Sequence, residues 1–424
     1  MILFEKYSIT DNLTNQDLKD GLYEALDKIG NVNRVLIIPP DFTRYHSRAG
    51  ELTSYAYQYY KDKITDILPA LGTHAPMAKD EIQNMFKDVP LKLFREHDWR
   101  NDVVTCGIVP GEYVSKITEN KIDYDWPAQL NKLILYGQHD LILSIGQVVP
   151  HEVLGMANYN KNLFIGTGGS EGINKSHFVG AVYGMERIMG RAMNPVRLLL
   201  NYASENFTAH LPIIYVHTVV AQDKEGKNTV KGLFIGNEFE VFEKAAELSI
   251  KVNFEMLEKP IKKAVVYLDP MEYKSTWLGN KSIYRTRMAI SDNGELIIIA
   301  PGVKTFGEDK TIDSLIRKYG YKGTNNILNA VKQNQDLQNN LGAAAHLIHG
   351  SSEGRFRITY CCPNMSKAEI ESVGFNYGDI NFFEEKYKTN NLKNGINFMP
   401  DGEEIFYISN PAIGLWSTKD KFNK

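Results

Sequence analysis

Arg-Val-Leu-Ile-Ile-Pro-Pro-Asp-Phe-Thr-Arg, residues 34–44, joins a short apolar run to a polar loop. The run 34–38 has the length and the Val/Ile content of a buried strand. In sheets built from such strands, the chemistry lies in the loops that follow the carboxyl ends of the strands. The stretch therefore predicts a strand of an α/β sheet with functional side chains at its end.

The same alternation of strands and helices continues along the first part of the chain. We expect an amphipathic helix over 55–71, strands over 140–145 and 211–220, and a polar turn over 223–228. A helical stretch over 240–257 then meets Lys-Pro-Ile-Lys-Lys, and a new apolar run follows it. This change of composition predicts a domain boundary.

Two domains are expected, because 424 residues exceed the size of one ordinary core. We place them at 1–258 and 259–424. The second domain again alternates, with strands predicted over 264–268, 296–300 and 356–361 and helices over 312–319 and 325–334. Each domain is predicted to be α/β, with a mainly parallel sheet flanked by helices and the active site in the cleft between the domains.

The composition restricts the class of partner. The net charge is -3, which argues against a nucleic-acid partner held by phosphate neutralisation. No apolar run is long enough to span a membrane, and the chain does not start like a signal peptide. Three cysteines give no disulfide framework, so we expect a cytoplasmic protein.

Four residues in loop-like settings stand out chemically. They are His74 in Leu-Gly-Thr-His, His151 in Val-Val-Pro-His, Lys161 ten residues later, and His177 in Asn-Lys-Ser-His. Imidazoles exchange protons near neutral pH and hold borderline metals, and a lysine amine can anchor a cofactor covalently. Taken singly, each residue has a structural interpretation as well, as a histidine bonded to the backbone or a solvated lysine.

Two further segments leave both interpretations open. Asp41 and Arg44 can form a turn after a strand, or they can grip a phosphate, a ribose or a carboxylate. The segment Gly-Thr-Gly-Gly-Ser, 166–170, can cradle a phosphate with its backbone N–H groups, or it can be a flexible turn.

Taken in order, these residues resemble the nickel-dependent lactate racemase family. The family shows Asp-His-Thr-Arg, a Gly-x-His about thirty residues on, and then a histidine, a lysine and a histidine. The chain has Asp-Phe-Thr-Arg at 41–44, Gly-Thr-His at 72–74, and His151, Lys161 and His177 at matching intervals. The resemblance covers the amino-terminal domain best.

The resemblance implies a cofactor and a role for each residue. The family uses a nickel pincer nucleotide, a pyridinium bisthiocarboxylic acid mononucleotide that carries Ni(II) and is made by cofactor-synthesis enzymes. By resemblance, Lys161 would carry it covalently, His177 would bind nickel, and His74 and His151 would be the catalytic acid–base pair. Asp41, Phe42, Thr43 and Arg44 would contact the cofactor, and Arg44 would also bind the substrate.

The implied reaction inverts C2 of a 2-hydroxy acid. The hydroxyl would lose a proton while C2 gives a hydride to the cofactor, and the planar 2-oxo acid could then take the hydride back on its other face. The second domain departs from the family's Tyr-Gln-x-x-Lys. Here Tyr284 is kept, but Arg285 stands in place of the Gln and Met288 in place of the Lys. We therefore expect Tyr284 and Arg285 to bind a substrate larger or more polar than lactate.

A sugar acid is the substrate that we expect, and it would make the reaction an aldonate 2-epimerisation. Three alternatives remain open from the sequence. The first is a racemase of lactate or another simple 2-hydroxy acid. The second is a zinc hydrolase that uses the three histidines as ligands, and the third is a non-catalytic protein that binds the nucleotide.

Overall fold

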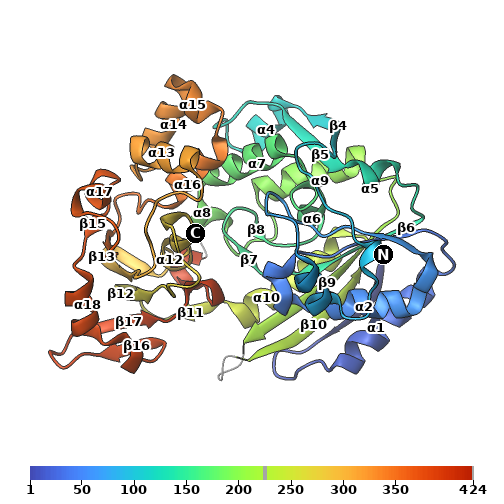
Figure 1. Cartoon of the computed structure of the whole chain (residues 1–424), viewed down its shortest axis with the longest axis horizontal. Coiled ribbons are helices and arrows are strands. Elements are labelled where there is room, and N and C mark those ends of the chain that lie inside the picture. Colours follow the sequence, from blue (N-terminus) through green and yellow to red (C-terminus); the bar gives the residue numbers. More distant parts are fainter. Residues whose placement is uncertain (223–226, 423–424) are drawn as a thin grey trace. The chain divides into compact units, whose positions relative to one another are not determined.

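The computed structural model describes residues 1–222 and 227–422, and the chain divides into two compact units (Figure 1). Unit 1 comprises Met1–Val179 and Ile188–Asn253, and unit 2 comprises Gly180–Arg187 and the chain from Phe254 onward. The boundary predicted between 258 and 259 falls inside unit 2. Most of the predicted turn over 223–228 lies outside the described residues.

Unit 1 is built on a six-stranded sheet in the order β1-β10-β9-β6-β2-β3. The four strands β9, β6, β2 and β3 are parallel, and β10 and β1 continue the sheet antiparallel. The strands are β1 (Ile2–Tyr7), β2 (Val35–Ile38), β3 (Ile64–Ile67), β6 (Leu141–Gln147), β9 (Ile213–Gln222) and β10 (Asn228–Gly236). The central strands β2 and β6 are buried at every position, as expected for a sheet covered on both faces.

Helices cover both faces of this sheet. Alternate strand residues such as Val35, Ile37 and Leu143 form one apolar cluster with α1 (Asn15–Ile29) and α2 (Ala49–Tyr60). Because side chains alternate along a strand, Ser144 and His217 point to the opposite face. That face is covered by α6 (Asn160–Phe164) and α10 (Phe239–Asn253).

The rest of unit 1 consists of short strands and helices that lie in the chain between the strands of this sheet. An antiparallel pair, β4 with β5, and a small hairpin, β7 with β8, precede the helices α6 to α9. These elements are α3 (Lys79–Phe86), β4 (Val103–Val109), α4 (Gly111–Ile117), β5 (Trp126–Asn131), α5 (Lys132–Tyr136), β7 (Pro150–His151), β8 (Gly155–Met156), α7 (Ser170–Tyr183) and α9 (Pro195–Phe207). The last residues of α7 and nearly all of α8 (Met185–Ile188) belong to the segment Gly180–Arg187 of unit 2.

Unit 2 contains a second sheet in the order β15-β14-β13-β12-β17-β16, parallel except for the edge strand β16. A separate parallel pair joins β11 to β18. The strands are β11 (Glu255–Leu257), β12 (Ile261–Tyr267), β13 (Ile290–Ile299), β14 (Arg357–Cys361), β15 (Asn376–Tyr377), β16 (Gly395–Phe398), β17 (Glu404–Ile408) and β18 (Trp416–Thr418).

Short helices flank the second sheet. Ile380 and Tyr387 of α18 pack on one face, against Val265 and Ile297. On the other face, Tyr360 donates a hydrogen bond to Asn280, which precedes α12. The helices are α11 (Thr276–Gly279), α12 (Lys281–Thr286), α13 (Lys310–Tyr319), α14 (Thr324–Gln333), α15 (Gln335–Gln338), α16 (Leu341–His349), α17 (Lys367–Ser372), α18 (Ile380–Tyr387) and α19 (Lys419–Phe422).

The predicted fold class, two α/β units with mainly parallel sheets, is confirmed. Two predicted helices were too long. The helix predicted over 55–71 ends at Tyr60, because Lys61 takes a positive φ of 51° and the β-branched residues of Ile64–Ile67 form β3 instead. The helix predicted over 240–257 ends at Asn253, because Glu255–Leu257 pairs with β18, far away in the sequence.

Within residues 1–222 and 227–422, no helix combines the length and the apolar character that crossing a membrane requires.

Candidate active site

The site of unit 1 lies where the sheet changes direction. From β2 the chain proceeds to β3 on one side and later to β6 on the other, so β2 and β6 flank a topological switch point. Loops that leave such a point diverge to opposite faces and leave room for a ligand at the carboxyl edge. The loops after β2, β3 and β6 supply residues 41–44, His74 and His151, respectively.

Asp41 organises the first loop. It is the N-cap of a short 3₁₀ helix, Phe42–Ser47, and its Oδ1 accepts hydrogen bonds from the backbone N–H and the hydroxyl of Thr43. Its other oxygen, Oδ2, lies 2.6 Å from Nδ1 of His74. Asp41 is buried, whereas the ring of His74 is exposed. The carboxylate therefore holds a ring that faces outward.

The charge on Asp41 determines the tautomer of His74. Burial raises the pKa of Asp41, but the hydrogen bonds from His74 and Thr43 outweigh it and hold the pKa below its ordinary value. The ionised carboxylate can only accept, so Nδ1 of His74 is the donor. Nε2 then carries the lone pair, and His74 is set up as a proton acceptor.

The loop that carries His74 is bonded to the segment that carries Lys161. Gly72 has a positive φ of 60°, and its N–H donates to the carbonyl oxygen of Gly166 at 2.8 Å. Gly166 in turn donates to the carbonyl oxygen of Lys161, at 2.9 Å. Two regions that are ninety residues apart in the chain are thus joined by main-chain bonds beside the site.

The Nδ1 atom of His151 accepts hydrogen bonds, whereas the Nδ1 atom of His74 donates one. His151 lies at the turn between β7 and β8, and its Nδ1 accepts from the backbone N–H groups of Val153 at 3.1 Å and Leu154 at 3.4 Å. A neutral ring with this acceptor carries its proton on Nε2. Burial keeps the pKa of His151 well below its ordinary value, and the charge of Lys161 lowers it further. His151 therefore presents a neutral N–H donor.

Lys161 lies in the first turn of the five-residue helix α6 and is half-buried. Burial lowers the pKa of its amine to about 8, and the nearby charge of Arg44 acts in the same direction. A minority of the amine, larger than for an ordinary lysine, is therefore unprotonated near neutral pH, and this is the nucleophilic form.

His177 is prepared as a ligand by its own helix. In α7, its Nδ1 lies 2.8 Å from the carbonyl oxygen of Ile173, which can only accept, so Nδ1 carries the proton. Nε2 is left with the lone pair that a metal requires, in the arrangement that metal-binding histidines generally show. Burial lowers the pKa of His177 to about 4, so the ring is neutral at pH 7.

The predicted residues of unit 1 lie close enough to influence one another. The charges of Lys161, His177 and Arg44 all act on the pKa of His151. Asp41 and Arg44 likewise act on Lys161. In the first loop Thr43 and Arg44 are exposed, while Phe42 is half-buried and packs against Tyr45, with 5.4 Å between ring centroids.

The three histidines do not form a metal cage. Among the residues that the structure describes, no three His, Cys, Asp or Glu side chains are grouped so that they could hold a metal ion. The zinc-hydrolase alternative requires such a group of His74, His151 and His177. A metal that arrives within a cofactor needs only one protein ligand, which His177 can provide.

Tyr284 and Arg285 lie on α12 in unit 2. Tyr284 belongs to the core of that unit, where its hydroxyl lies 2.6 Å from Nδ1 of His346, and Trp277 stacks on the same imidazole. Arg285 is half-buried. Their predicted role in binding substrate stays a prediction.

The sequence analysis missed a group of buried polar residues around Lys161. Arg197 of α9 is fully buried and contacts the segment just before α6. Its sequence signal is a lone arginine within the apolar run Pro-Val-Arg-Leu-Leu-Leu, 195–200, because a buried charge is rare without a specific purpose.

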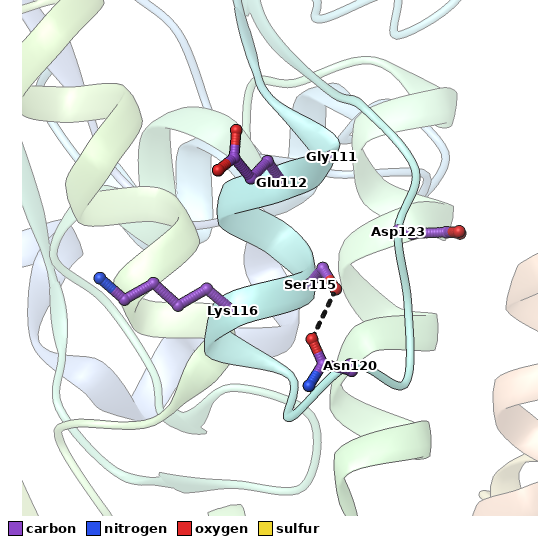
Figure 2. A pocket seen from close by; sticks show the side chains of 6 residues that line it. All are labelled: Gly111, Glu112, Ser115, Lys116, Asn120 and Asp123. Carbon is purple, nitrogen blue, oxygen red and sulfur yellow. Dashed lines mark hydrogen bonds between the residues drawn. The ribbon is translucent and has the colours of Figure 1, made fainter.

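A separate pocket of unit 1 lies on α4 and the loop after it (Figure 2). Ser115 and Asn120 face one another there across the helix end and form a hydrogen bond of 3.1 Å. None of the predicted site residues lines it. The lining residues are Gly111, Glu112, Ser115, Lys116, Asn120 and Asp123.

Fold and site together define a two-unit α/β protein with a histidine–carboxylate pair, a partly neutral lysine and a ligand-ready histidine at one sheet edge. The part of the chain that carries this site, residues 9–188, matches the family model of the lactate racemase N-terminal domain. The match covers less than half of the 424 residues. No curated protein matches the sequence.

Two solved structures are similar over nearly the whole chain. A crystal structure of a protein from Thermotoga maritima has a TM-score of 0.80 and 24% identity, and the match covers 97% of this chain and 100% of that one. The lactate racemase apoprotein from Thermoanaerobacterium thermosaccharolyticum has a TM-score of 0.67 and 17% identity, with 95% and 89% covered. At these identities the likeness shows the fold.

Proposed function

We propose that the protein is a racemase or epimerase that inverts C2 of a 2-hydroxy acid with a nickel pincer nucleotide. One observation supports the proposal most: the residues that the family resemblance singled out lie near enough to act on one another's pKa, and the hydrogen bonds of His74, His151 and His177 suit the roles that the resemblance implies. The match of residues 9–188 to the lactate racemase N-terminal domain supports the same assignment.

The residues present fit this cofactor. The partly neutral amine of Lys161 suits a covalent link to a thiocarboxylate arm, and the Nε2 lone pair of His177 suits nickel, which accepts imidazole beside sulfur. Arg44 would supply positive charge for the cofactor's phosphate. When bound, the cofactor takes up and returns the C2 hydride.

His74 and His151 are the proposed acid–base pair, and they differ in which ring nitrogen carries the proton. His74, backed by Asp41, accepts the proton of the substrate hydroxyl at Nε2. His151 donates a hydrogen bond from Nε2 to the substrate oxygen. Exchange of these roles, which the opposite enantiomer requires, needs the His151 ring to turn and to release the N–H groups of Val153 and Leu154.

The preferred substrate is a sugar acid, so that the reaction is an aldonate 2-epimerisation. The support lies in the sequence, where Arg285 and Met288 replace the family's Gln and Lys. Arg44 is the proposed partner of the substrate carboxylate, since a guanidinium binds a carboxylate through two parallel bonds. Racemisation of lactate or of another simple 2-hydroxy acid is the alternative.

The test uses protein produced together with the cofactor-synthesis enzymes. Intact-mass and peptide-mass spectrometry should find a covalent adduct on Lys161, with Lys161→Ala as the control that carries none. The loaded protein should exchange the C2 hydrogen of an aldonate for deuterium faster than that of lactate. Absence of any adduct contradicts the cofactor assignment. Exchange with lactate and with no aldonate contradicts the substrate assignment.

A further inference from the structure

The backbone just before Lys161 is held in a strained conformation. Asn158 and Tyr159 are consecutive non-glycine residues with positive φ angles of 68° and 59°. Side chains disfavour this region, so such a pair persists only where the surroundings determine it. Tyr159 is the N-cap of α6, and Lys161 follows in its first turn. The direction of α6 therefore depends on whatever holds these two residues.

Arg197 binds the segment that contains Asn158 and Tyr159 through hydrogen bonds. One guanidinium nitrogen donates to the carbonyl oxygen of Met156 at 2.8 Å, and the other donates to the carbonyl oxygen of Asn158 at 3.3 Å and to the side-chain oxygen of Asn160. The face of the guanidinium lies 4.4 Å from the ring centroid of Phe242. One planar fork thus binds three successive points of the turn.

Burying the charge of Arg197 lowers the stability of the folded state. Arg197 is fully buried, and no carboxylate of the described chain pairs with it. Burial lowers its pKa to about 10, so it remains cationic at neutral pH. A buried cation balanced only by carbonyl dipoles is unfavourable unless its geometry is well satisfied. An apolar side chain of similar size would leave the oxygens of Met156, Asn158 and Asn160 without this donor.

Other buried polar side chains hold the same short segment. Asn160 donates to Asn201 at 2.8 Å and Asn162 donates to the carbonyl oxygen of Ile145 at 3.1 Å. Asn158 donates to Nδ1 of His217 at 2.9 Å. A β-carbon at Gly146 would lie 2.7 Å from the Asn158 side chain, so the glycine leaves room for it. Every asparagine between 158 and 162 is therefore tied to the sheet or to α9.

We propose that Arg197 is a positioning residue for Lys161: through Met156, Asn158 and Asn160 it fixes the strained turn from which the lysine projects. The role of Lys161 as cofactor anchor rests on the proposed function. The contacts of Arg197 do not depend on it and can be tested in cofactor-free protein. Arg197 donates to two main-chain oxygens and one side-chain amide oxygen of this segment, so any effect on the cofactor would be indirect, through the position of Lys161.

The experiment compares Arg197→Met with a matched control, Leu22→Ala, in cofactor-free protein. Leu22 is fully buried in α1, far from α6 in the chain, so its truncation lowers stability without touching the turn. Hydrogen exchange of 157–165 and the acylation rate of Lys161, relative to surface lysines such as Lys92 and Lys304, are measured well below the melting temperature. Asn201→Ala is a milder second variant, should Arg197→Met not fold.

Arg197→Met should raise hydrogen exchange of 157–165 at least tenfold and change the relative acylation rate of Lys161 severalfold. Leu22→Ala, with a similar loss of melting temperature, should leave both unchanged. In protein made beside the cofactor-synthesis enzymes, Arg197→Met should also lose most of the Lys161 adduct. Equal behaviour of the two variants overturns the inference. If wild-type protein carries no adduct, the proposed function fails, and the exchange and acylation data still decide the role of Arg197.

Discussion

The carboxylate of Asp41 lies 2.6 Å from Nδ1 of His74, and these two residues come from the loops after adjacent parallel strands. Asp41 is buried and has a lowered pKa, so it fixes one tautomer of an exposed ring. A base that is oriented by a carboxylate is a recurrent catalytic arrangement on unrelated folds. Here the orientation depends on Thr43 too, which binds the other oxygen of the carboxylate.

Asp41→Asn should disable His74 without moving it. The amide can present N–H₂ to Nδ1, which favours the wrong tautomer and removes the lone pair from Nε2. By analogy with carboxylates that orient a catalytic histidine, C2-hydrogen exchange should fall by roughly 10²–10⁴-fold. Thr43→Val, which removes one bond to Asp41, is the control and should lose far less. Equal activity of Asp41→Asn and wild type would show that the pair is structural.

His177→Gln should separate the two ways in which the cofactor is held. We expect nickel retained after dialysis to fall by roughly tenfold or more, because the imidazole is lost, while the mass adduct on Lys161 persists. Elemental analysis and peptide mass spectrometry on the same sample measure both. The adjacent Ser176→Ala is the control. Unchanged nickel in His177→Gln would assign the protein ligand to another residue.

The pH dependence of stability should include a contribution from His217. Burial, and then the charge of Arg197, lower its pKa to about 3, whereas the unfolded value is near 6.5. Its contribution is therefore complete above pH 6.5 and is lost as the pH falls toward 3, by up to about 1.4 kcal/mol per pH unit. Urea unfolding between pH 7.5 and 4.5 measures the slope. His217→Phe should unfold with a shallower slope, and an unchanged slope would contradict the prediction.

Two phenols in unit 2 make a matched pair of probes. Tyr284 lies 2.6 Å from Nδ1 of His346, and Tyr321 lies 2.9 Å from Nε2. A neutral imidazole donates from one nitrogen and accepts at the other, so one phenol accepts and one donates. Tyr284→Phe and Tyr321→Phe should each cost about 1–3 kcal/mol of unfolding free energy, because a buried group loses its partner. If Tyr284→Phe instead changes KM alone, its predicted contact with substrate is favoured.

Local patterns were enough to predict several central strands, but not β1, β3 and β10 of the first sheet. The apolar runs at 34–38 and 140–145 form β2 and β6, and the residues after them reach the site because carboxyl ends of parallel strands share an edge. The partners of those residues were not predictable. Nothing local links Asp41 to His74, or Arg197 to the turn before Lys161, since both pairings arise from packing of distant segments. A distant partner also explains why the helix predicted over 240–257 was too long. Its last residues form β11, which pairs with residues 416–418.

The membership of Gly180–Arg187 in unit 2 affects how the protein can be dissected. The chain passes from one unit to the other three times, after Val179, Arg187 and Asn253, so no single cut releases either unit intact. A fragment ending at 258 would retain Glu186 but lose Arg287 and Arg355, whose guanidinium groups pair with it at 3.1 and 2.8 Å. Such a fragment would remove both of these ion pairs from Glu186, which lies on α8, shortly after the helix that bears His177. Expression trials and deletion studies should therefore use the whole chain, because each unit contains segments from both sides of the other.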